Sequence, residues 1–239
     1  MENHFGPEVA ARYDERTTST AEVVDAIVDF LVGVAGDGPA LEFGIGTGRI
    51  ALPLAARGVV VRGIDLSEAM LARLRAKPGG DTVGVTTGDF ATARIEGEYS
   101  LVYLVANTIM NLTTQDEQVA CFENASAHLG PGGRFLIEVI VPGWQRLPPG
   151  ERFQVFDVSP NHVGFDEIDV VTQASVSHHY WIEDGRVDVS APPFRYVWPA
   201  ELDLMARIAG MSLRERWGGW SREPFAAEST KHVSVWEKH

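Results

Sequence analysis

The sequence predicts an α/β protein built on a mostly parallel sheet with helices on both faces, plus an inserted small antiparallel sheet. Three observations lead to this fold class. Short apolar runs alternate with helical patterns between residues 40 and 141, which favours parallel βαβ units. The first of these runs leads into a glycine cluster, in the stretch "LEFGIGTGRIALPLA". Between residues 150 and 198 valine and aromatic residues alternate with polar residues, which is typical of antiparallel strands.

The elements expected in the first part of the chain follow from apolar spacing and from cap residues. A helix with Ser19 or Thr20 as its cap comes first, in "STAEVVDAIVDFLVGVAG". Strands and helices then alternate. The strands are expected at 40–43, 59–64, 82–86, 100–105 and 134–141, and the helices at 48–56, 67–76 and 114–129. Between the last helix and the last of these strands, "GPGG" at 130–133 is expected to be a turn.

The elements expected after residue 142 are of two kinds. Two or three antiparallel strands are expected at 150–198, including a hairpin in "SHHYWIEDGRVDVS" that turns at Asp184-Gly185. A helix at 199–209 then begins on Pro199, and strands at 212–217 and 232–237 close the chain. The length of 239 residues fits one large α/β domain as well as two small ones, and we expect a single domain. We divide that domain (1–239) into a helical cap at 1–38, a core at 39–141, the inserted strands at 142–198 and a final segment at 199–239.

Composition excludes several classes of protein. The formal net charge of −13, with no basic stripe, argues against nucleic acid or an anionic membrane as partner. No apolar run is long enough to span a bilayer, and residues 1–10 do not resemble a signal peptide. The single cysteine, Cys121, is expected to be a small core residue. A cytoplasmic protein is the resulting expectation.

The glycine cluster predicts a ligand site at the end of the first strand. Gly44, Gly46 and Gly48 allow unusual backbone angles and a close approach of the backbone, although a tight turn alone would also need glycines. The dinucleotide fingerprint requires a third glycine at the position held by Arg49. Glu42 beside the loop would repel a pyrophosphate but suits an ammonium group, and Arg49 can pair with a carboxylate. These features indicate an amino-acid moiety rather than NAD.

The next two strand ends carry acidic residues as well. Asp65 is placed to accept the hydroxyls of a ribose, or alternatively to cap the following helix. After the third strand, Asp89 in Gly88-Asp89-Phe90 can accept an amino group of a purine while Phe90 flanks the base. The alternative is an ordinary turn with a core phenylalanine. Together the three strand ends indicate one ligand with an amino acid, a ribose and an adenine.

At this point the sequence resembles the class I S-adenosylmethionine-dependent methyltransferase family, of the small-molecule type. The pieces that carry the resemblance are "LEFGIGTGRI", "GIDLSEAM", "TGDF", "LVYLVANTIMNL" and "HLGPGGRFLIE", and they cover residues 38–141. The family implies a Rossmann-like seven-stranded sheet whose last strand, here 232–237, lies antiparallel between the two before it. The family's Asn-Pro-Pro-Tyr tetrapeptide, typical of members that methylate nucleic acid or protein amides, is absent, and "ANTI" stands in its place.

The resemblance implies a set of residues that bind S-adenosylmethionine, with S-adenosylhomocysteine as product. Tyr13, in "RYDER", resembles a tyrosine that folds over the cofactor. The full expected set is Tyr13, Glu42, Gly44, Gly46, Gly48, Arg49, Asp65, Leu66, Gly88, Asp89, Phe90, Val105, Ala106 and Asn107. No metal site is expected.

The chemistry of methyl transfer suggests a few catalytic candidates. Tyr13 is a candidate for holding the methyl-sulfonium, and Glu138, His178 and His179 are candidates for a general base. His178 and His179 alternate across a strand, so at most one faces a pocket. Glu138 can equally be a structural carboxylate at the strand end. Arg195 and Tyr196 offer polar contacts to a substrate, or form part of the core.

The predicted function is transfer of a methyl group from S-adenosylmethionine to N or O of a small metabolite. The alternative is a non-catalytic S-adenosylmethionine-binding regulatory or assembly protein. An NAD-type oxidoreductase is disfavoured by Arg49. A homodimer formed through the aromatic strands of 150–198 is a further expectation.

Overall fold

A seven-stranded sheet forms the centre of the molecule. The computed structural model describes residues 3–16, 20–143, 147–183 and 185–239. The strand order is β11-β12-β5-β4-β1-β2-β3, and β12 is antiparallel to both of its neighbours while β5, β4, β1, β2 and β3 are parallel. The strands are β1 (Ala40–Phe43), β2 (Val61–Asp65), β3 (Gly84–Thr87), β4 (Tyr99–Leu104), β5 (Leu129–Ile140), β11 (Met211–Trp217) and β12 (Lys231–Lys238). This order confirms the predicted Rossmann-like sheet.

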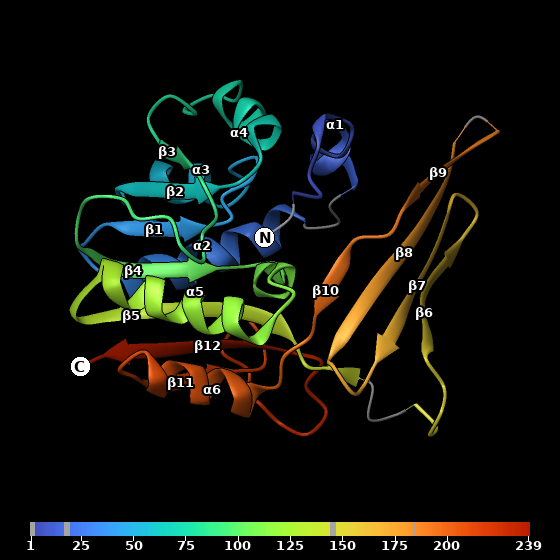
Figure 1. Cartoon of the computed structure of the whole chain (residues 1–239). Coiled ribbons are helices and arrows are strands. Elements are labelled where there is room, and N and C mark those ends of the chain that lie inside the picture. Colours follow the sequence, from blue (N-terminus) through green and yellow to red (C-terminus); the bar gives the residue numbers. More distant parts are fainter. Residues whose placement is uncertain (1–2, 17–19, 144–146, 184) are drawn as a thin grey trace.

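Helices cover both faces of this sheet, as Figure 1 shows. On one face α5 and α6 pack over a core that contains Phe122, Phe135 and Trp236. On the other face α2, α3 and α4 enclose a second core around Leu31, Leu54 and Leu71. The helices are α2 (Ala21–Ala35), α3 (Ala51–Ala56), α4 (Glu68–Arg75), α5 (Gln115–His128), α6 (Pro199–Ile208) and the short 3-10 helix η1 (Thr108–Asn111).

A second, antiparallel sheet stands beyond the carboxyl ends of the central parallel strands, with helix α1 (Pro7–Arg16) between the two (Figure 1). Its strands run in the order β10-β8-β7-β6, and β9 pairs with β8 beside β10. They are β6 (Phe153–Ser159), β7 (His162–Asp169), β8 (Ala174–Glu183), β9 (Arg186–Ser190) and β10 (Pro193–Arg195). Five strands are present where two or three were predicted, because β6 and β10 also join the sheet.

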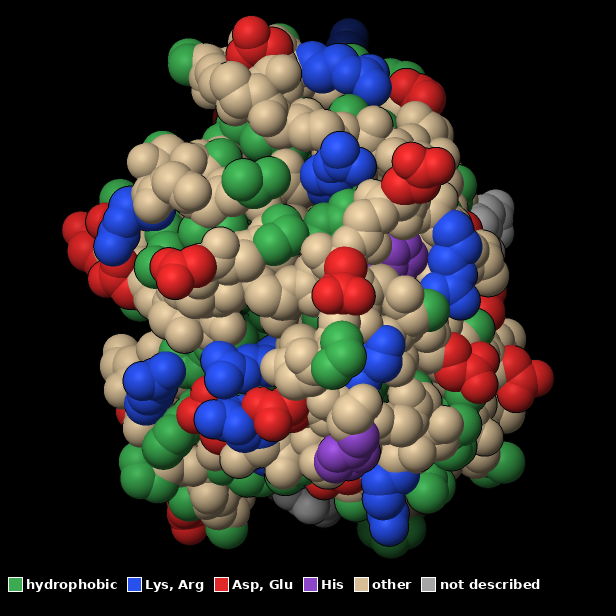
Figure 2. Space-filling model, turned by 90° about the vertical axis from the view of Figure 1, so that its left-hand side faces the viewer, with side chains coloured by type: hydrophobic (Ala, Val, Ile, Leu, Met, Phe, Trp, Pro, Cys, Tyr) green, Lys and Arg blue, Asp and Glu red, His purple; other side chains and the backbone are tan. Residues whose placement is uncertain are grey.

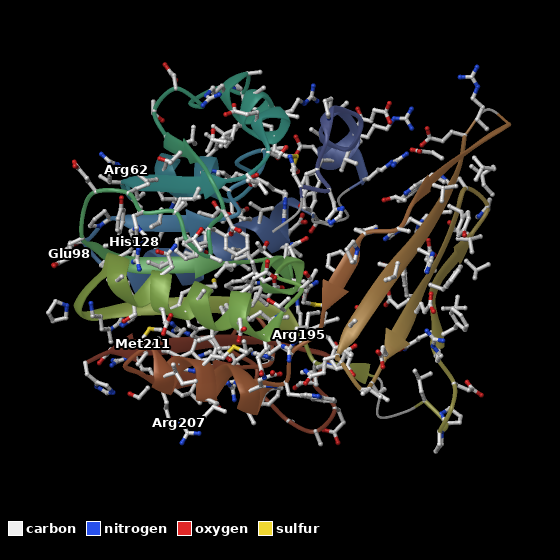
Figure 3. All side chains as sticks on the ribbon, viewed as in Figure 1. Arg62, Glu98, His128, Arg195, Arg207 and Met211 are labelled. Atoms are coloured by element: carbon white, nitrogen blue, oxygen red, sulfur yellow. The ribbon has the colours of Figure 1, made fainter. Side chains whose placement is uncertain are left out.

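A buried ion pair fastens the second sheet to the main domain. Arg195 Nη2 lies 2.7 Å from Glu201 Oε1 of α6, and Arg195 Nη1 donates to Gln118 of α5. Arg195 lies where β10 meets these helices (Figure 3). Tyr196 is buried in the core of this face. Arg195 and Tyr196 therefore attach the second sheet to the main domain and do not lie where a substrate would bind.

Several element boundaries differ from the prediction. Helix α3 begins at Ala51 instead of Gly48, because the glycine loop extends through Gly48 with left-handed backbone angles. Helix α1 was not predicted. "GPGG" lies inside β5 as an irregularity between the Tyr99–Leu129 and Leu101–Arg134 pairs. Of the predicted turn and cap residues, Asp184 and Ser19 lie outside the described residues, and the pairing of Glu183 with Arg186 confirms the hairpin.

The surface at the amino-terminal ends of the parallel strands carries mixed charge. Figure 2 shows acidic and basic side chains dispersed over this face, with no continuous basic area. Among the helices within the described residues, none has the length and apolarity needed to cross a membrane. Cys121 is buried on α5 and forms no disulfide, as expected.

Candidate active site

A small cavity lies at the carboxyl ends of β1 and β2, and we call it the strand-end cavity. Its volume is about 60 Å³. It is lined by Asn3, Phe5, Tyr13, Gly44, Gly46, Asp65, Leu66, Met70, Phe90, Thr108 and Asn111. Six of the predicted binding residues are therefore brought together at one point: Tyr13, Gly44, Gly46, Asp65, Leu66 and Phe90.

The glycine loop needs its glycines for two physical reasons. Gly44, Gly46 and Gly48 have φ of 71°, 54° and 74°, in the region that side chains rarely adopt. A Cβ on Gly44 would stand 2.6 Å from Thr108 Cγ2, and one on Gly48 would stand 2.9 Å from Leu74 Cγ. Gly48 is absent from the lining of the strand-end cavity, so packing against α4 already accounts for it.

Asp65 ties the glycine loop to the next helix. Its Oδ2 atom accepts a hydrogen bond from the Gly46 N–H at 2.7 Å, and Oδ1 accepts one from the Ser67 N–H at 2.8 Å. Burial raises the pKa of the Asp65 carboxyl, and the backbone hydrogen bonds from Ser67, Gly46 and Leu66 oppose that rise. Ser67, not Asp65, is the N-cap of α4, since its side chain accepts from the Met70 N–H.

The third strand end contributes one cavity residue. Phe90 lines the strand-end cavity and stacks on Phe43, with ring centroids 6.0 Å apart. Asp89 accepts a hydrogen bond from the Ala91 N–H at 2.9 Å, which closes a local turn. Gly88 donates its N–H to the Asp65 carbonyl. Asp89 and Gly88 are absent from the cavity lining.

Glu42 lies behind the loop rather than in the cavity. It is 3% exposed, and its Oε2 atom accepts a hydrogen bond from the Tyr103 hydroxyl at 2.9 Å. Burial raises the pKa of the Glu42 carboxyl to about 8, although the bond from Tyr103 and the nearby charge of Arg49 lower it. Arg49 lines a surface depression with Asp14 and Lys77.

Helix α1 carries Tyr13 over the strand ends. Tyr13 lines the strand-end cavity and packs edge-on against Phe5, with centroids 6.1 Å apart. Burial raises the pKa of the Tyr13 hydroxyl, and the Arg49 charge opposes this. The helix is held from the other side as well, because Arg12 and Arg16 pair with Glu183 and Asp188 of the second sheet.

The loop after β4 has a left-handed turn at Ala106 and Asn107, with φ of 56° and 62°. Glu138 on β5 accepts a hydrogen bond from the Ala106 N–H at 2.8 Å, and Asn107 Oδ1 accepts one from the Ile140 N–H at 2.8 Å. Val105 is buried and is absent from the lining of the strand-end cavity. Glu138 is absent from that lining as well and lies 3.5 Å from Lys231 Nζ, so its position is that of a strand-end carboxylate holding a strained turn.

A second cavity lies between the strand ends and the second sheet, and we call it the inter-sheet cavity. Its volume is about 360 Å³. Phe5, Tyr13, Thr108 and Asn111 line both cavities, so the two adjoin. The remaining lining residues are Ala106, Asn107, Met110, Ile140, Phe156, Asp166, Ser175, Ser177, His179 and Phe194.

Of the two adjacent histidines on β8, the structure places His179 at the inter-sheet cavity. His178 lies on the opposite face, stacked on Phe165 with centroids 4.7 Å apart and 3.4 Å from Glu167. The period-2 alternation of a strand was foreseen, but which face turns inward was not. Asp166 and Ser177, also at this cavity, were missed because they carry no motif.

Comparison with known proteins agrees with this geometry. Residues 40–133 match the family described as "Methyltransferase domain". The structure of the CcbJ methyltransferase from Streptomyces caelestis is 36% identical, with a TM-score of 0.89, over 100% of this chain and 99% of that one. The chain belongs to the class I S-adenosylmethionine-dependent methyltransferases.

Two other relatives agree with this assignment. The cypemycin N-terminal methyltransferase of a Streptomyces species is 26% identical over 243 residues, which cover 95% of this chain and 97% of that protein. The structure of CalS10, an amino pentose methyltransferase from Micromonospora echinaspora with S-adenosylmethionine bound, shares the fold at a TM-score of 0.73 and 22% identity, with full coverage of both chains. The predicted enzyme class, small-molecule type and cofactor are confirmed.

The residues at the strand ends suit S-adenosylmethionine. Asp65 presents a carboxylate to the strand-end cavity, the type of group that can accept hydrogen bonds from ribose hydroxyls, and Phe90 lines the same cavity with an apolar ring. Gly44 and Gly46 line it without side chains. When bound, the cofactor supplies an electrophilic methyl group on a sulfonium whose leaving thioether is neutral.

Proposed function

We propose that this methyltransferase acts on an amine nitrogen of a small molecule that binds in the inter-sheet cavity. The observation that carries the proposal is the lining of that cavity. Asp166 and His179 lie beside the rings of Tyr13, Phe156 and Phe194. A carboxylate with aromatic faces suits a cationic amine, and a histidine suits removal of its proton.

The relatives support nitrogen over oxygen. The curated relative that covers nearly the whole chain is an N-terminal methyltransferase, whose acceptor is an amine by its name. An amine must be neutral to attack a methyl group, so the enzyme has to remove a proton before or during transfer. The cavity of about 360 Å³ has the size of ordinary small-molecule sites.

Within the cofactor site we assign roles by position. Asp65 and Leu66 bind the ribose, Phe90 the adenine, and Gly44 and Gly46 the methionine end. Gly88 and Asp89 shape the adenine side, while Gly48 shapes the glycine loop. Glu42 is assigned to the ammonium side as a hydrogen-bonding carboxyl group behind the loop, and Arg49 supplies a positive charge for the carboxylate group. Val105, Ala106 and Asn107 form the wall toward the acceptor.

For the reaction itself we assign Tyr13 to the boundary between the two cavities, where the methyl group passes. Its ring lines both. Glu138 is assigned as a positioning residue, since its contact is with the Ala106 N–H. Of the two candidate bases on β8 we retain His179 and not His178, because His179 lines the cavity.

The test of this function begins with two assays. Calorimetry measures binding of S-adenosylhomocysteine. Turnover is then measured as S-adenosylhomocysteine formed from S-adenosylmethionine with the tripeptide Ala-Ala-Ala, D-glucosamine, a phenol and a carboxylic acid. Methylation of an amine supports the proposal. Binding without turnover of any acceptor favours the alternative, a non-catalytic regulatory protein.

We also propose that the chain forms a homodimer through the outer face of the second sheet. That face, turned away from the inter-sheet cavity, exposes Phe153, Val155, Val187 and Val189, each more than half accessible. Light scattering of the wild type and of Val155→Lys tests this: a monomer in both argues against it. The net charge of −13 argues against nucleic acid as a partner, and the lone buried cysteine favours a cytoplasmic location.

A further inference from the structure

A row of hydrogen-bonded side chains crosses the second sheet on the face toward the inter-sheet cavity. His179 Nε2 lies 3.2 Å from Ser177 Oγ, and His179 Nδ1 lies 3.0 Å from His162 Nε2. His162 Nδ1 lies 2.6 Å from Asp157 Oδ2. The three strands β6, β7 and β8 thus contribute one residue each to a continuous chain of imidazole and carboxylate groups.

The two ends of this row open to different spaces. Ser177 and His179 line the inter-sheet cavity. Asp157 and His162 line a separate outer depression, together with Arg12 and Arg16 of α1. The Asp157 side chain is 42% exposed, whereas that of His162 is 7% exposed. The row therefore connects the inter-sheet cavity to a separate depression at the surface.

The hydrogen-bond directions are determined by the acidic end. Ionised Asp157 accepts only, so His162 donates from Nδ1 and presents the lone pair of Nε2. His179 then donates from Nδ1 to that lone pair, which leaves its own Nε2 as an acceptor toward Ser177 and the cavity. Every ring nitrogen has a partner when the single O–H proton of Ser177 is directed to His179 Nε2 rather than to Asp166, and the atom nearest the acceptor is then a base.

Other charged groups surround the row. Burial lowers the pKa of His179, and the charges of His162, Arg16 and His178 lower it further, which favours the neutral ring. On the other side, Asp166 carries a hydrogen bond with Ser177. Glu183 and Asp188 pair with Arg16, whose guanidinium stacks over the Trp181 ring at 4.6 Å.

We propose that Asp157, His162 and His179 form a proton relay that deprotonates the methyl acceptor and delivers its proton to the outer depression. The inference rests on the proposed function, since it assumes an acceptor that carries a proton. The N–H bond of the acceptor breaks, its electron pair stays on nitrogen, and the proton passes through Ser177 to His179 Nε2. His179 Nδ1–H passes its proton to His162 Nε2, and His162 Nδ1–H passes its proton to Asp157, from which water takes it. His179 is the catalytic residue, and His162 and Asp157 are positioning residues.

The arrangement is tested without any acceptor by ¹⁵N NMR of histidine-labelled full-length protein with S-adenosylhomocysteine at pH 8. We expect His162 and His179 both protonated at Nδ1. Asp157→Asn should mix or reverse their tautomers, because the acceptor-only group is lost. The control is Tyr180→Phe, next to His179 on the same strand but on the other face, which should leave both tautomers unchanged. A wild-type His179 ring protonated at Nε2 overturns the relay.

The catalytic role is tested with Ala-Ala-Ala and D-glucosamine as acceptors. His179→Gln should lower kcat about 10²-fold or more, the usual contribution of a general base, with KM little changed. Asp157→Asn should lower kcat and shift the acidic limb of the pH–rate profile to lower pH, because the protonated relay loses its counter-charge. A merely structural role for Asp157 would not move that limb. If neither amine is methylated, the proposed function with an amine acceptor is contradicted. If His179→Gln keeps full activity on an amine, the proton relay is contradicted while the proposed function stands.

Discussion

The carboxylate of Asp65 is hydrogen-bonded to the backbone N–H of Gly46 at 2.7 Å. This bond joins the end of β2 to the glycine loop after β1, so two adjacent strand ends act as one unit. The same carboxylate faces the strand-end cavity. Asp65 therefore both shapes the loop and is placed to bind the ligand beside it.

Replacement of Asp65 tests this double role. Asp65→Ala should weaken S-adenosylhomocysteine binding by at least ~1–3 kcal/mol, the cost of leaving polar groups unpaired. It should also lower the free energy of unfolding, because the Gly46 and Ser67 N–H groups lose their acceptor. Calorimetry and urea unfolding measure the two effects, with the exposed Asp81→Ala as control. Unchanged binding would refute the ribose assignment.

The close contact between Gly44 and Thr108 gives a second prediction. Gly44→Ala should destabilise the protein by roughly 2–4 kcal/mol, because the new Cβ would meet Thr108 Cγ2 at 2.6 Å in a backbone with φ of 71°. Gly58→Ala separates the two causes: φ is 90° there, but no atom lies within 4 Å. Its cost should be only about 1–2 kcal/mol in the same urea unfolding experiment. Equal costs at both positions would contradict the packing argument.

The raised pKa of Glu42 predicts that the free energy of unfolding depends on pH. Its folded pKa of about 8 lies above the ordinary value, so between pH 4.5 and 8 the folded chain holds a proton that the unfolded chain releases. Its contribution to stability is full below pH 4.5 and is lost as pH rises to 8, at about 1.4 kcal/mol per pH unit. Glu42→Gln should flatten this slope in urea unfolding at pH 5, 6.5 and 8, whereas the exposed Glu8→Gln should not. An unchanged slope in Glu42→Gln would show that the carboxyl ionises normally.

The attachment of α1 to the second sheet predicts an effect on ligand exchange. The strand-end cavity of about 60 Å³ is too small for a nucleoside, and its lining includes Phe5 and Tyr13, so the N-terminal segment must shift on entry. Arg16 holds α1 through Asp188 and the Trp181 ring. Arg16→Gln should speed S-adenosylhomocysteine dissociation about fivefold, since an exposed ion pair and a cation–π contact contribute together about 1 kcal/mol. Stopped-flow dissociation measures this, and Arg57→Gln, which breaks a surface ion pair with Asp29 on α2, should leave the rate unchanged.

Much of the cofactor site was predictable because its signals are local. These signals lie within one βαβ unit. Its first strand is followed by Gly44, Gly46 and Gly48, and its second strand ends in Asp65. Parallel strands bring successive carboxyl ends to one edge of a sheet, so the proximity of Asp65 to the glycine loop followed from the order of elements. The boundary of α3 was wrong by three residues because the left-handed loop continues to Gly48.

The sequence by itself thus determined the fold class, the order of the strand ends that carry the predicted binding residues, and the enzyme class. The tertiary structure alone decided which side chains meet at the acceptor side. It turned His179 inward and His178 outward, buried Arg195 against Glu201, and brought Asp157 and His162 into line from separate strands. The physical reason is that strand alternation offers two equivalent faces, and only long-range packing of the inserted sheet against α1 and the central strand ends selects between them.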